Sequence, residues 1–194
     1  MTEKGTQSEV RIPLLERDIL TDAPPELSAL YDVLLAQRGV VPNMFKTLAH
    51  VPTLAIGFAS LLKPLLSDGA LPGWYKELVA TRISVLLKSS YAIKAHSISA
   101  KQKGATEQQI AAAQADFESG PFTEQQKLGF RCAERLHRSA AEIDDSFYAE
   151  LKMLFADQQI IELIATASAF ELFPRFVDAL RIPTTPLPQA QRQT

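Results

Sequence analysis

The sequence predicts an all-α protein. Apolar residues recur at three- and four-residue intervals in several segments, which is the spacing of one face of a helix. Capping residues and glycines bound these segments. No segment shows the apolar–polar alternation typical of a half-buried strand. With 194 residues, 46% of them hydrophobic, the chain can bury a substantial core without disulfides or metals, so we expect one compact helical domain.

The N-terminal third is expected to hold two amphipathic helices. The first covers 26–38 and ends near Gly39. A connector, VVPNMFKTLAH, then turns into a short helix, and a second apolar stripe runs over 54–65. Pro64 should kink the last turn of that helix. The stripe residues of the two helices are Leu27, Leu30, Tyr31, Leu34 and Leu35, then Leu54, Phe58, Leu61, Leu62 and Leu65.

Two helices are expected next. The first covers 74–88, and the second begins at Ser89–Ser90, which interrupts the first, and runs to Lys103. Along the first helix a polar stripe of Glu77, Thr81, Ser84 and Lys88 lies opposite its apolar face. A serine at a helix start accepts a hydrogen bond from a free amide of the first turn, so the serine pair predicts the N-cap of the second helix. Gly104 should close that helix.

Capping boxes mark two further helix starts. Thr106 with Gln109, and Thr123 with Gln126, predict helices over about 107–117 and 124–140. Apolar spacing predicts another helix around 147–155. A last long helix should begin near Asp157, with Pro174 breaking or bending it.

The predicted domain organisation has three parts. A polar leader covers 1–22, the helical domain covers 23–182, and a proline-rich tail covers 183–194. The tail is too polar and too rich in proline to pack as a helix, so we expect an extended arm or a disordered segment.

Charge and composition exclude several functions. The formal net charge is only −2, so no basic field is available for nucleic acid or an anionic membrane. The single cysteine, Cys132, cannot form an internal disulfide, and the polar N-terminus lacks a signal-peptide-like apolar run, so we expect a cytoplasmic protein. The glycines are scattered singly and no nucleotide cofactor is implied. His50 and His137 have no acidic or cysteine neighbours at ligand spacing, so no metal site is predicted.

The order of elements resembles a known family. The segments that carry the resemblance are VPNMFKTLAH, KELVATRISVL, YAIKAH, the Gly-Ala-Thr connector at 104–106, FTEQQKLGFRCAERLH and QQIIELIATASAFELFPRFVDAL. They are similar to the alkylhydroperoxidase-D-like (AhpD-like) branch of the carboxymuconolactone decarboxylase family. The resemblance implies an AhpD-like multi-helix bundle. It also implies a homo-oligomer, which has independent support because LLKPLL at 61–66 and the apolar residues of 160–176 cover more than one helix face.

The resemblance places a site at the helix pair. AhpD-like members carry a glutamate on the first helix, a Cys-x-x-Cys pair opening the second, and a histidine four residues after the second cysteine. Glu77 and His96 match the glutamate and the histidine, whereas the cysteine positions fall on Ser89 and Ala92. Tyr91 also differs from the histidine that some members have there. A thiolate is the nucleophile of peroxide reduction, so dithiol peroxidase activity is not expected.

Ser89 does not replace the missing thiol as a nucleophile activated by His96. Seven helical residues separate the two Cα atoms by roughly 10 Å, beyond direct hydrogen-bond reach. The remaining acid–base candidates are His96 and Glu77, because a neighbouring carboxylate raises the pKa of a histidine and fixes its tautomer. Arg82, Lys88 and Lys94 could hold a substrate carboxylate, and the predicted substrate-binding set is Arg82, Ser89, Tyr91 and Lys94.

Two functional hypotheses follow. The first is a cofactor-independent enzyme, a decarboxylase-like lyase that uses His96 and Glu77 on a small carboxylate-bearing molecule. The second is a family member without thiols that binds a small molecule, or serves as an assembly subunit, without catalysis. Under the second, His96 is simply satisfied by the carboxylate, the basic residues form the solvated side of a helix, and Cys132 is a small buried hydrophobe.

Overall fold

The computed structural model of this chain describes residues 10–19 and 23–186, and all regular elements in these ranges are helices. The all-α prediction is therefore confirmed for this part of the chain. Most of the predicted polar leader, at 1–9 and 20–22, and the end of the predicted tail, at 187–194, lie outside the described residues.

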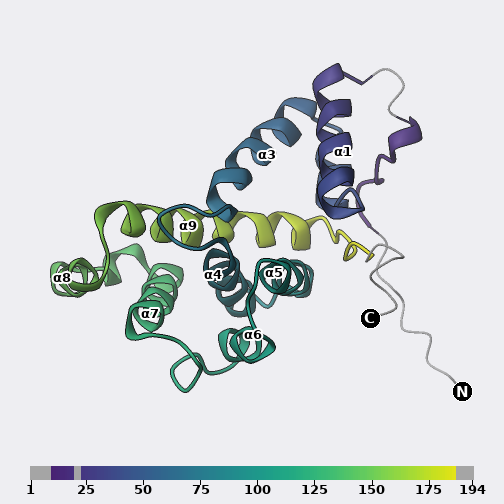
Figure 1. Ribbon diagram of the computed structural model, residues 1–194. Helices are drawn as coiled ribbons and strands as arrows, with labels where there is room; N and C mark the ends of the chain where they lie inside the picture. The colour runs from purple at the N-terminus through teal and green to yellow at the C-terminus, as the bar shows by residue number, and fades with distance from the viewer. Residues whose placement is uncertain (1–9, 20–22, 187–194) are drawn as a thin grey trace, which may run out of the picture. The chain divides into compact units, whose positions relative to one another are not determined.

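The helices follow one another along the chain as labelled in Figure 1. Their bounds are η1 Arg17–Ile19, α1 Pro25–Arg38, α2 Asn43–Leu48, α3 Pro52–Leu66, α4 Gly73–Leu86, α5 Ser90–Gln102, α6 Glu107–Gln114, α7 Glu124–Arg138, η2 Ala140–Glu142, α8 Asp145–Leu154 and α9 Asp157–Ala179.

The chain divides into two compact units, and the boundaries fall within α3 and α9. One unit is Met1–Ala59 with Phe176–Thr194, and the other is Ser60–Arg175. In the first unit, Tyr31 is buried and its hydroxyl donates to the Leu15 carbonyl at 2.8 Å. Asn43 donates from its amide side chain to the Pro183 carbonyl and from its backbone to the Thr185 hydroxyl. These bonds fix the beginning of the proline-rich segment.

Helix α4 is the central element of the second unit. Its apolar residues Tyr75, Leu78, Val79, Ala80 and Ile83 are 0–1% exposed, and the polar residues of its other side, Glu77, Thr81 and Ser84, are completely buried as well. A helix that is covered on every side needs neighbours around it. It contacts α5, α6 and α7, which surround it in Figure 1. Any polar residue of α4 is consequently drawn into the interior with the apolar ones.

A tight reversal joins α4 to α5. Lys88 has a left-handed conformation (φ 58°), its amide bonds to the Val85 carbonyl, and the Ser89 amide bonds to the Ser84 carbonyl. This pair of bonds is the Schellman motif, which usually ends in glycine because a side chain is strained at positive φ. The reversal lays α5 alongside α4, so that residues equally far from Lys88 in the two helices lie at the same level.

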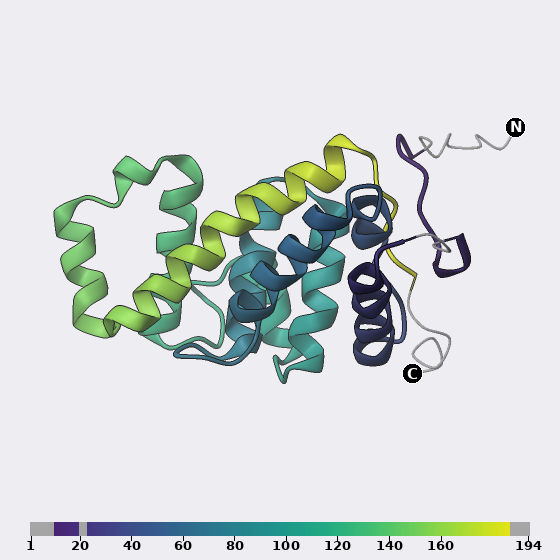
Figure 2. The same ribbon diagram turned by 90° about the horizontal axis from the view of Figure 1, so that it is seen from above.

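The predicted helix boundaries are largely confirmed. Both capping boxes form, at Thr106 and at Thr123. The helix expected over 107–117 ends earlier, at Gln114, and the one expected over 124–140 ends at Arg138. The chain then passes through η2 into α8 and from there into α9, a path that Figure 2 shows from above.

One local expectation was wrong, and for another the structure excludes one of the two expected outcomes. The Ser89 hydroxyl makes no capping hydrogen bond, although Ser89 does occupy the N-cap position of α5. Helix α9 is not broken at Pro174 but continues to Ala179. A proline removes a single backbone donor, and a long helix whose face is packed can continue past that loss.

Candidate functional site: a buried Glu77–His96 pair

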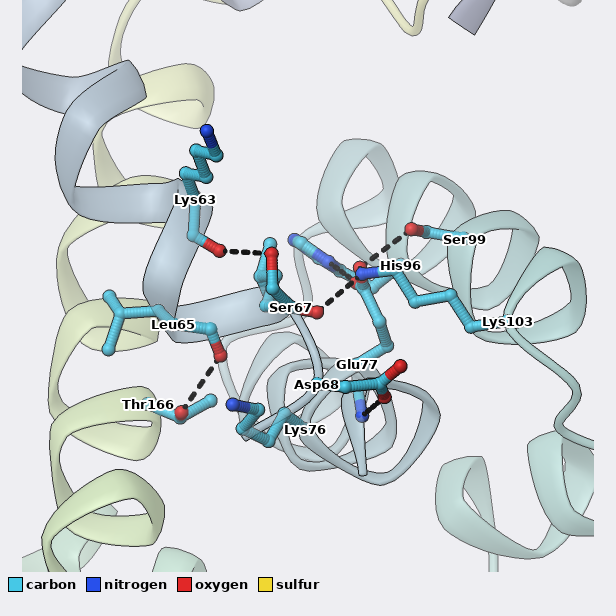
Figure 3. A network of polar contacts seen from close by, with 12 residues as sticks. Lys63, Leu65, Ser67, Asp68, Lys76, Glu77, His96, Ser99, Lys103 and Thr166 are labelled. Carbon is cyan, nitrogen blue, oxygen red and sulfur yellow. Dashed lines mark hydrogen bonds and ion pairs between the residues drawn. The ribbon is translucent and has the colours of Figure 1, made fainter. Parts of the chain in front are cut away.

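The centre of the candidate site is the carboxylate of Glu77 on α4, which is completely buried. One oxygen, Oε2, lies 2.7 Å from Nδ1 of His96. The other, Oε1, accepts from the Ser99 hydroxyl at 2.6 Å and from the Lys103 ammonium at 2.5 Å. Figure 3 shows these three side chains approaching the carboxylate from α5 and its C-terminal end. The expected approach of Glu77 to His96 is thus present in the structure.

The three donors lie on one face of α5 because of their spacing. His96, Ser99 and Lys103 follow each other at intervals of three and four residues, which is the repeat of a helix face. Ser89 and Ala92 continue this face toward the start of the helix, and both are buried. The side of α5 that faces α4 therefore carries every functional candidate of this helix except Tyr91 and Lys94.

Lys103 was not among the predicted site residues. Its ammonium is held between Glu77 and the carbonyl of Leu66, to which it donates at 2.6 Å. The signal that could have identified it is the interval of seven residues from His96, which places both on the same helix face. In the sequence it appeared only as the residue before the terminating Gly104.

The remaining members of the predicted polar stripe of α4 do not join the site. The hydroxyl of Thr81 donates to the Glu77 carbonyl and that of Ser84 to the Ala80 carbonyl, each one turn back along the helix. Both hydroxyls are satisfied by their own helix, as is usual for buried serine and threonine in helices. Only Glu77 of this stripe reaches α5.

The charge state of Glu77 is fixed by its partners. Burial alone would raise the pKa of the carboxyl group, but the hydrogen bonds and positive charges of His96 and Lys103 outweigh burial and lower the pKa to about 2. Glu77 is therefore a carboxylate at neutral pH. An ionised carboxylate only accepts hydrogen bonds, so Nδ1 of His96 carries the proton and Nε2 is the nitrogen that can exchange one.

The ring of His96 is also fixed by packing. Phe170 of α9 lies edge-on against it, with ring centroids 4.5 Å apart and an interplanar angle of 81°. The histidine side chain is 14% exposed and Phe170 only 1%. The imidazole is thus held on one side by a carboxylate and on another by an aromatic edge, with a small part of it open to solvent.

Three of the predicted substrate-binding residues lie at the N-cap and in the first turns of α5. Tyr91 and Ser89 are both buried, and the Ser89 hydroxyl has no hydrogen-bond partner among the described residues. Lys94 lies on the exposed side of the helix. Of these substrate-binding candidates, Ser89 and Tyr91 are therefore buried, whereas Lys94 lies at the surface.

Arg82 lies away from the Glu77–His96 pair. Its guanidinium binds Glu134 through two nitrogens, at 2.7 and 2.5 Å, and donates to the carbonyls of Ala113 and Ala115 at the end of α6. It also lies over the ring of Phe117. These groups of the protein occupy the fork of the guanidinium, and its role in substrate binding remains a prediction.

A second histidine–glutamate pair occurs in the same unit. His137 Nδ1 on α7 lies 2.6 Å from Glu171 on α9, whose other oxygen binds Arg175 at 2.9 Å. Sequence reasoning missed this pair, because its members are 34 residues apart and no local pattern joins them. His50 contacts the carbonyl of Pro13. Within the described residues, no group of three or more histidine, cysteine, aspartate or glutamate side chains is arranged to hold a metal ion.

Cys132 is completely buried on α7. Burial raises the pKa of its thiol to about 11, with Arg135 acting weakly in the opposite direction. The thiolate form that would act as a nucleophile is therefore scarce at neutral pH. This environment agrees with the interpretation of Cys132 as a small buried hydrophobe.

Comparison with known proteins identifies the class. Residues 52–135 match the sequence model of the Carboxymuconolactone decarboxylase family, the family that the sequence resembles. The segment contains Glu77, His96, Ser99 and Lys103. No curated protein sequence matches the chain.

Solved structures extend the likeness to the whole fold. An uncharacterized peroxidase-related protein from Silicibacter sp. TM1040 matches with a TM-score of 0.81 at 20% identity, covering 95% of both chains. An AhpD-core, peroxidase-related protein from Ralstonia eutropha JMP134 matches with a TM-score of 0.82 at 19% identity, over 92% of this chain and 94% of that one. The debrominase Bmp8 matches with a TM-score of 0.78 at 21% identity, over 94% and 96%. The fold is AhpD-like, as the resemblance implied.

No helix in the described part of the chain is both long and apolar enough to cross a membrane.

Proposed function

We propose that this protein is a cofactor-independent acid–base enzyme of the carboxymuconolactone decarboxylase family that acts on a small molecule. The observation that carries the proposal is the 2.7 Å contact between His96 Nδ1 and a fully buried carboxylate. His96 exchanges a proton with substrate through Nε2, and Glu77 fixes the tautomer and orientation of the ring. A correctly placed general acid–base group contributes about 10²- to 10⁴-fold to a rate.

The role of Glu77 differs from that of a proton carrier. With a pKa of about 2, its carboxylate stays ionised through the neutral range and does not pick up a proton from substrate. It is a positioning residue in this proposal, and His96 is the catalytic one. The reaction class we favour is a decarboxylase-like lyase step. His96 takes a proton from the substrate at Nε2, the C–C bond to the substrate carboxylate breaks and CO2 leaves, and the carbon that keeps the electron pair receives the proton back from His96.

The substrate class we propose is a small carboxylate-bearing molecule. The start of α5 favours an anion because its first amides point outward and the helix dipole is positive there. Ser89 and Tyr91 lie at this end and are the candidate groups for the carboxylate. Bmp8 offers a parallel: a cysteine-to-alanine variant of that debrominase was solved in complex with 2,3,4-tribromopyrrole. A missing thiol is thus compatible with small-molecule binding in this fold.

The rival function is small-molecule binding without catalysis. Ala92 favours it, because the residue one turn before His96 has no functional group to offer to a reaction. Binding without turnover, unchanged by substitution of His96, would favour this rival.

The first test is a thermal-shift screen against small carboxylates, lactones and hydroperoxides, because a molecule that binds the native state preferentially raises its melting temperature. Turnover of each hit is then compared in wild type, His96→Gln and His137→Gln. We expect a loss of 10²-fold or more in His96→Gln, with an unchanged helical circular-dichroism signal, and normal turnover in His137→Gln. Full activity in His96→Gln would overturn the proposal.

Dithiol hydroperoxide reduction is not part of the proposed function. Ser89 and Ala92 offer no thiol, and Cys132 is buried with a raised pKa. We therefore expect no hydroperoxide turnover with dithiol reductants. Robust turnover that disappears in Cys132→Ala would show that the single thiol is reactive.

We also propose that the protein forms a homo-oligomer. The exposed side of α9 carries Ile161, Ala165, Ser168 and Leu172 at intervals of four, three and four residues, a stripe without charge whose two large members are 66% and 51% exposed. Such spacing suits packing against the same helix of a second copy. Light scattering at micromolar concentration should give a multiple of the 21.4 kDa chain mass, reduced in Ile161→Lys. A monomer at all concentrations would refute this proposal.

A further inference from the structure

We propose that Lys103 is a positioning residue that supplies the positive charge balancing Glu77, so that His96 can remain uncharged beside that carboxylate and act as a base. The consequence for catalysis rests on the proposed function. The effect on His96 itself does not, and it can be measured without any substrate.

The geometry gives one carboxylate two possible cationic partners. Lys103 Nζ lies 2.5 Å from Oε1 of Glu77, and His96 Nδ1 lies 2.7 Å from Oε2. The third donor, the hydroxyl of Ser99, is neutral and shares Oε1 with the lysine. Each carboxylate oxygen thus faces one group that is able to carry positive charge.

Lys103 is held where its charge is needed. The ammonium donates to the Leu66 carbonyl at 2.6 Å as well as to Glu77, and its side chain is two-thirds buried. A lysine that merely solvates a helix end would extend its amine into water. Lys63 of α3 is such an exposed lysine, and in Figure 3 its side chain points away from Glu77. Instead, the amine of Lys103 turns inward and joins the end of α3 to the buried carboxylate.

The charge balance decides the state of His96. A buried carboxylate must be accompanied by a positive charge, because an unpaired ion in the interior is strongly unfavourable. With Lys103 in place, Glu77 is neutralised and the imidazole can give Nδ1–H to the carboxylate while keeping an unprotonated Nε2. Without Lys103, protonation of His96 restores the balance while the carboxylate keeps its remaining hydrogen bonds, and an imidazolium cannot accept a proton from substrate.

The other charged side chains near the pair are engaged elsewhere. On α4, Lys76 binds Glu162 of α9 and Arg82 binds Glu134 of α7. Lys101 of α5 pairs with Glu107 of α6 at the surface, and Lys94 of α5 is exposed. Asp68 accepts a hydrogen bond from the Gly73 amide, and Glu171 of α9 pairs with His137. The α9 side chain against His96 itself is the apolar Phe170.

The experiment follows the imidazole nitrogens of the full-length protein by two-bond ¹H–¹⁵N NMR between pH 5 and 9. The chain has only three histidines, and the His96 signals are assigned by their absence in His96→Gln. We expect the midpoint of the His96 titration in Lys103→Met to lie about 1 to 3 pH units above that of wild type, because an uncompensated carboxylate favours the imidazolium. Lys103→Arg keeps the charge and should remain within a few tenths of a unit of wild type.

Two controls separate charge from other effects. Ser99→Ala removes a neutral donor from the same carboxylate oxygen, and Lys101→Met removes an exposed lysine from the same helix. Both should shift the midpoint much less than Lys103→Met. If Lys103→Met does not fold, Lys103→Gln provides the same test, because an amide keeps a hydrogen-bond donor without the charge.

An unchanged or lowered midpoint in a folded Lys103→Met or Lys103→Gln variant would overturn the inference. An equal shift in Ser99→Ala would also overturn it, since the cause would then be the hydrogen bond and not the charge. The result is independent of turnover: if His96→Gln retains full activity, the proposed function fails while the titration result for Lys103 stands.

Discussion

The two histidine–glutamate pairs of the second unit have the same chemistry but different surroundings. The Nδ1–carboxylate distance is 2.7 Å for His96 with Glu77 and 2.6 Å for His137 with Glu171. Glu77 is completely buried, whereas the Glu171 side chain is 23% exposed. The other oxygen of Glu77 binds Lys103, whose side chain is 33% exposed. The other oxygen of Glu171 binds Arg175, whose side chain is 63% exposed.

This difference shows that the contact by itself does not define a functional site. A partly exposed pair is screened by water and can exchange its partners for solvent. A buried carboxylate cannot, so its charge state and the tautomer of its histidine are set by the protein. For this reason our proposal gives the proton-transfer role to His96 and not to His137.

The largest expected effect is on folding stability when the buried pair is broken. Glu77→Gln leaves Lys103 facing an uncharged amide in the interior, and we expect it to lower the free energy of unfolding by about 3–5 kcal/mol. Urea denaturation of wild type and variant at pH 7 measures this difference. A loss below about 1 kcal/mol would mean that the Glu77 site is as well solvated as the Glu171 site.

A somewhat smaller effect is expected from acid. The pKa of Glu77 is about 2 in the folded protein and 4.5 as its ordinary value, so the stabilisation is fully present above about pH 4.5 and is lost as the pH falls toward 2. A shift of this size corresponds to about 3 kcal/mol. Wild type should therefore lose more stability than Glu77→Gln between pH 6 and pH 3 in urea denaturation. Parallel losses in the two proteins would contradict the lowered pKa.

Ser99 of α5 and Ser89 at the N-cap of the same helix are both buried, but we expect their removal to change the free energy of unfolding differently. Ser99→Ala removes a hydrogen bond to the buried carboxylate, and we expect a cost of about 1.5–3 kcal/mol. Ser89→Ala removes a buried hydroxyl that has no partner in the described part of the chain, so we expect a neutral or slightly stabilising result. Thermal denaturation of both variants distinguishes them. A clear loss in Ser89→Ala would show that this hydroxyl is hydrogen-bonded in solution.

The smallest effect is expected at the second pair. Glu171→Gln removes an ion pair whose members remain accessible to water, and we expect a change below about 1 kcal/mol that decreases further with added salt. Urea denaturation at low and at high salt measures it. A cost as large as that of Glu77→Gln would remove the distinction between the two pairs.

Local signals in the sequence predicted most of the helices. The capping boxes at Thr106 and Thr123 located two helix starts because each uses side chains only three residues apart. The serine pair at 89–90 likewise located the break between α4 and α5. Local signals were insufficient where packing competes with local preference: α9 is not broken at Pro174, which was one of the two outcomes expected there, and Ser89 occupies the N-cap position without bonding to the helix amides.

The sequence by itself determined the all-α class and the face of α5 that carries His96, because helix periodicity acts between residues close together in the chain. The resemblance to a family then pointed to Glu77 as the partner of that face. Only the tertiary structure decided which charges meet: Lys103 on Glu77, Arg82 on Glu134, and His137 on Glu171. Such contacts join different helices, and their geometry depends on how those helices pack. Burial, which makes one of two similar pairs a candidate site, likewise arises only once the chain has folded around it.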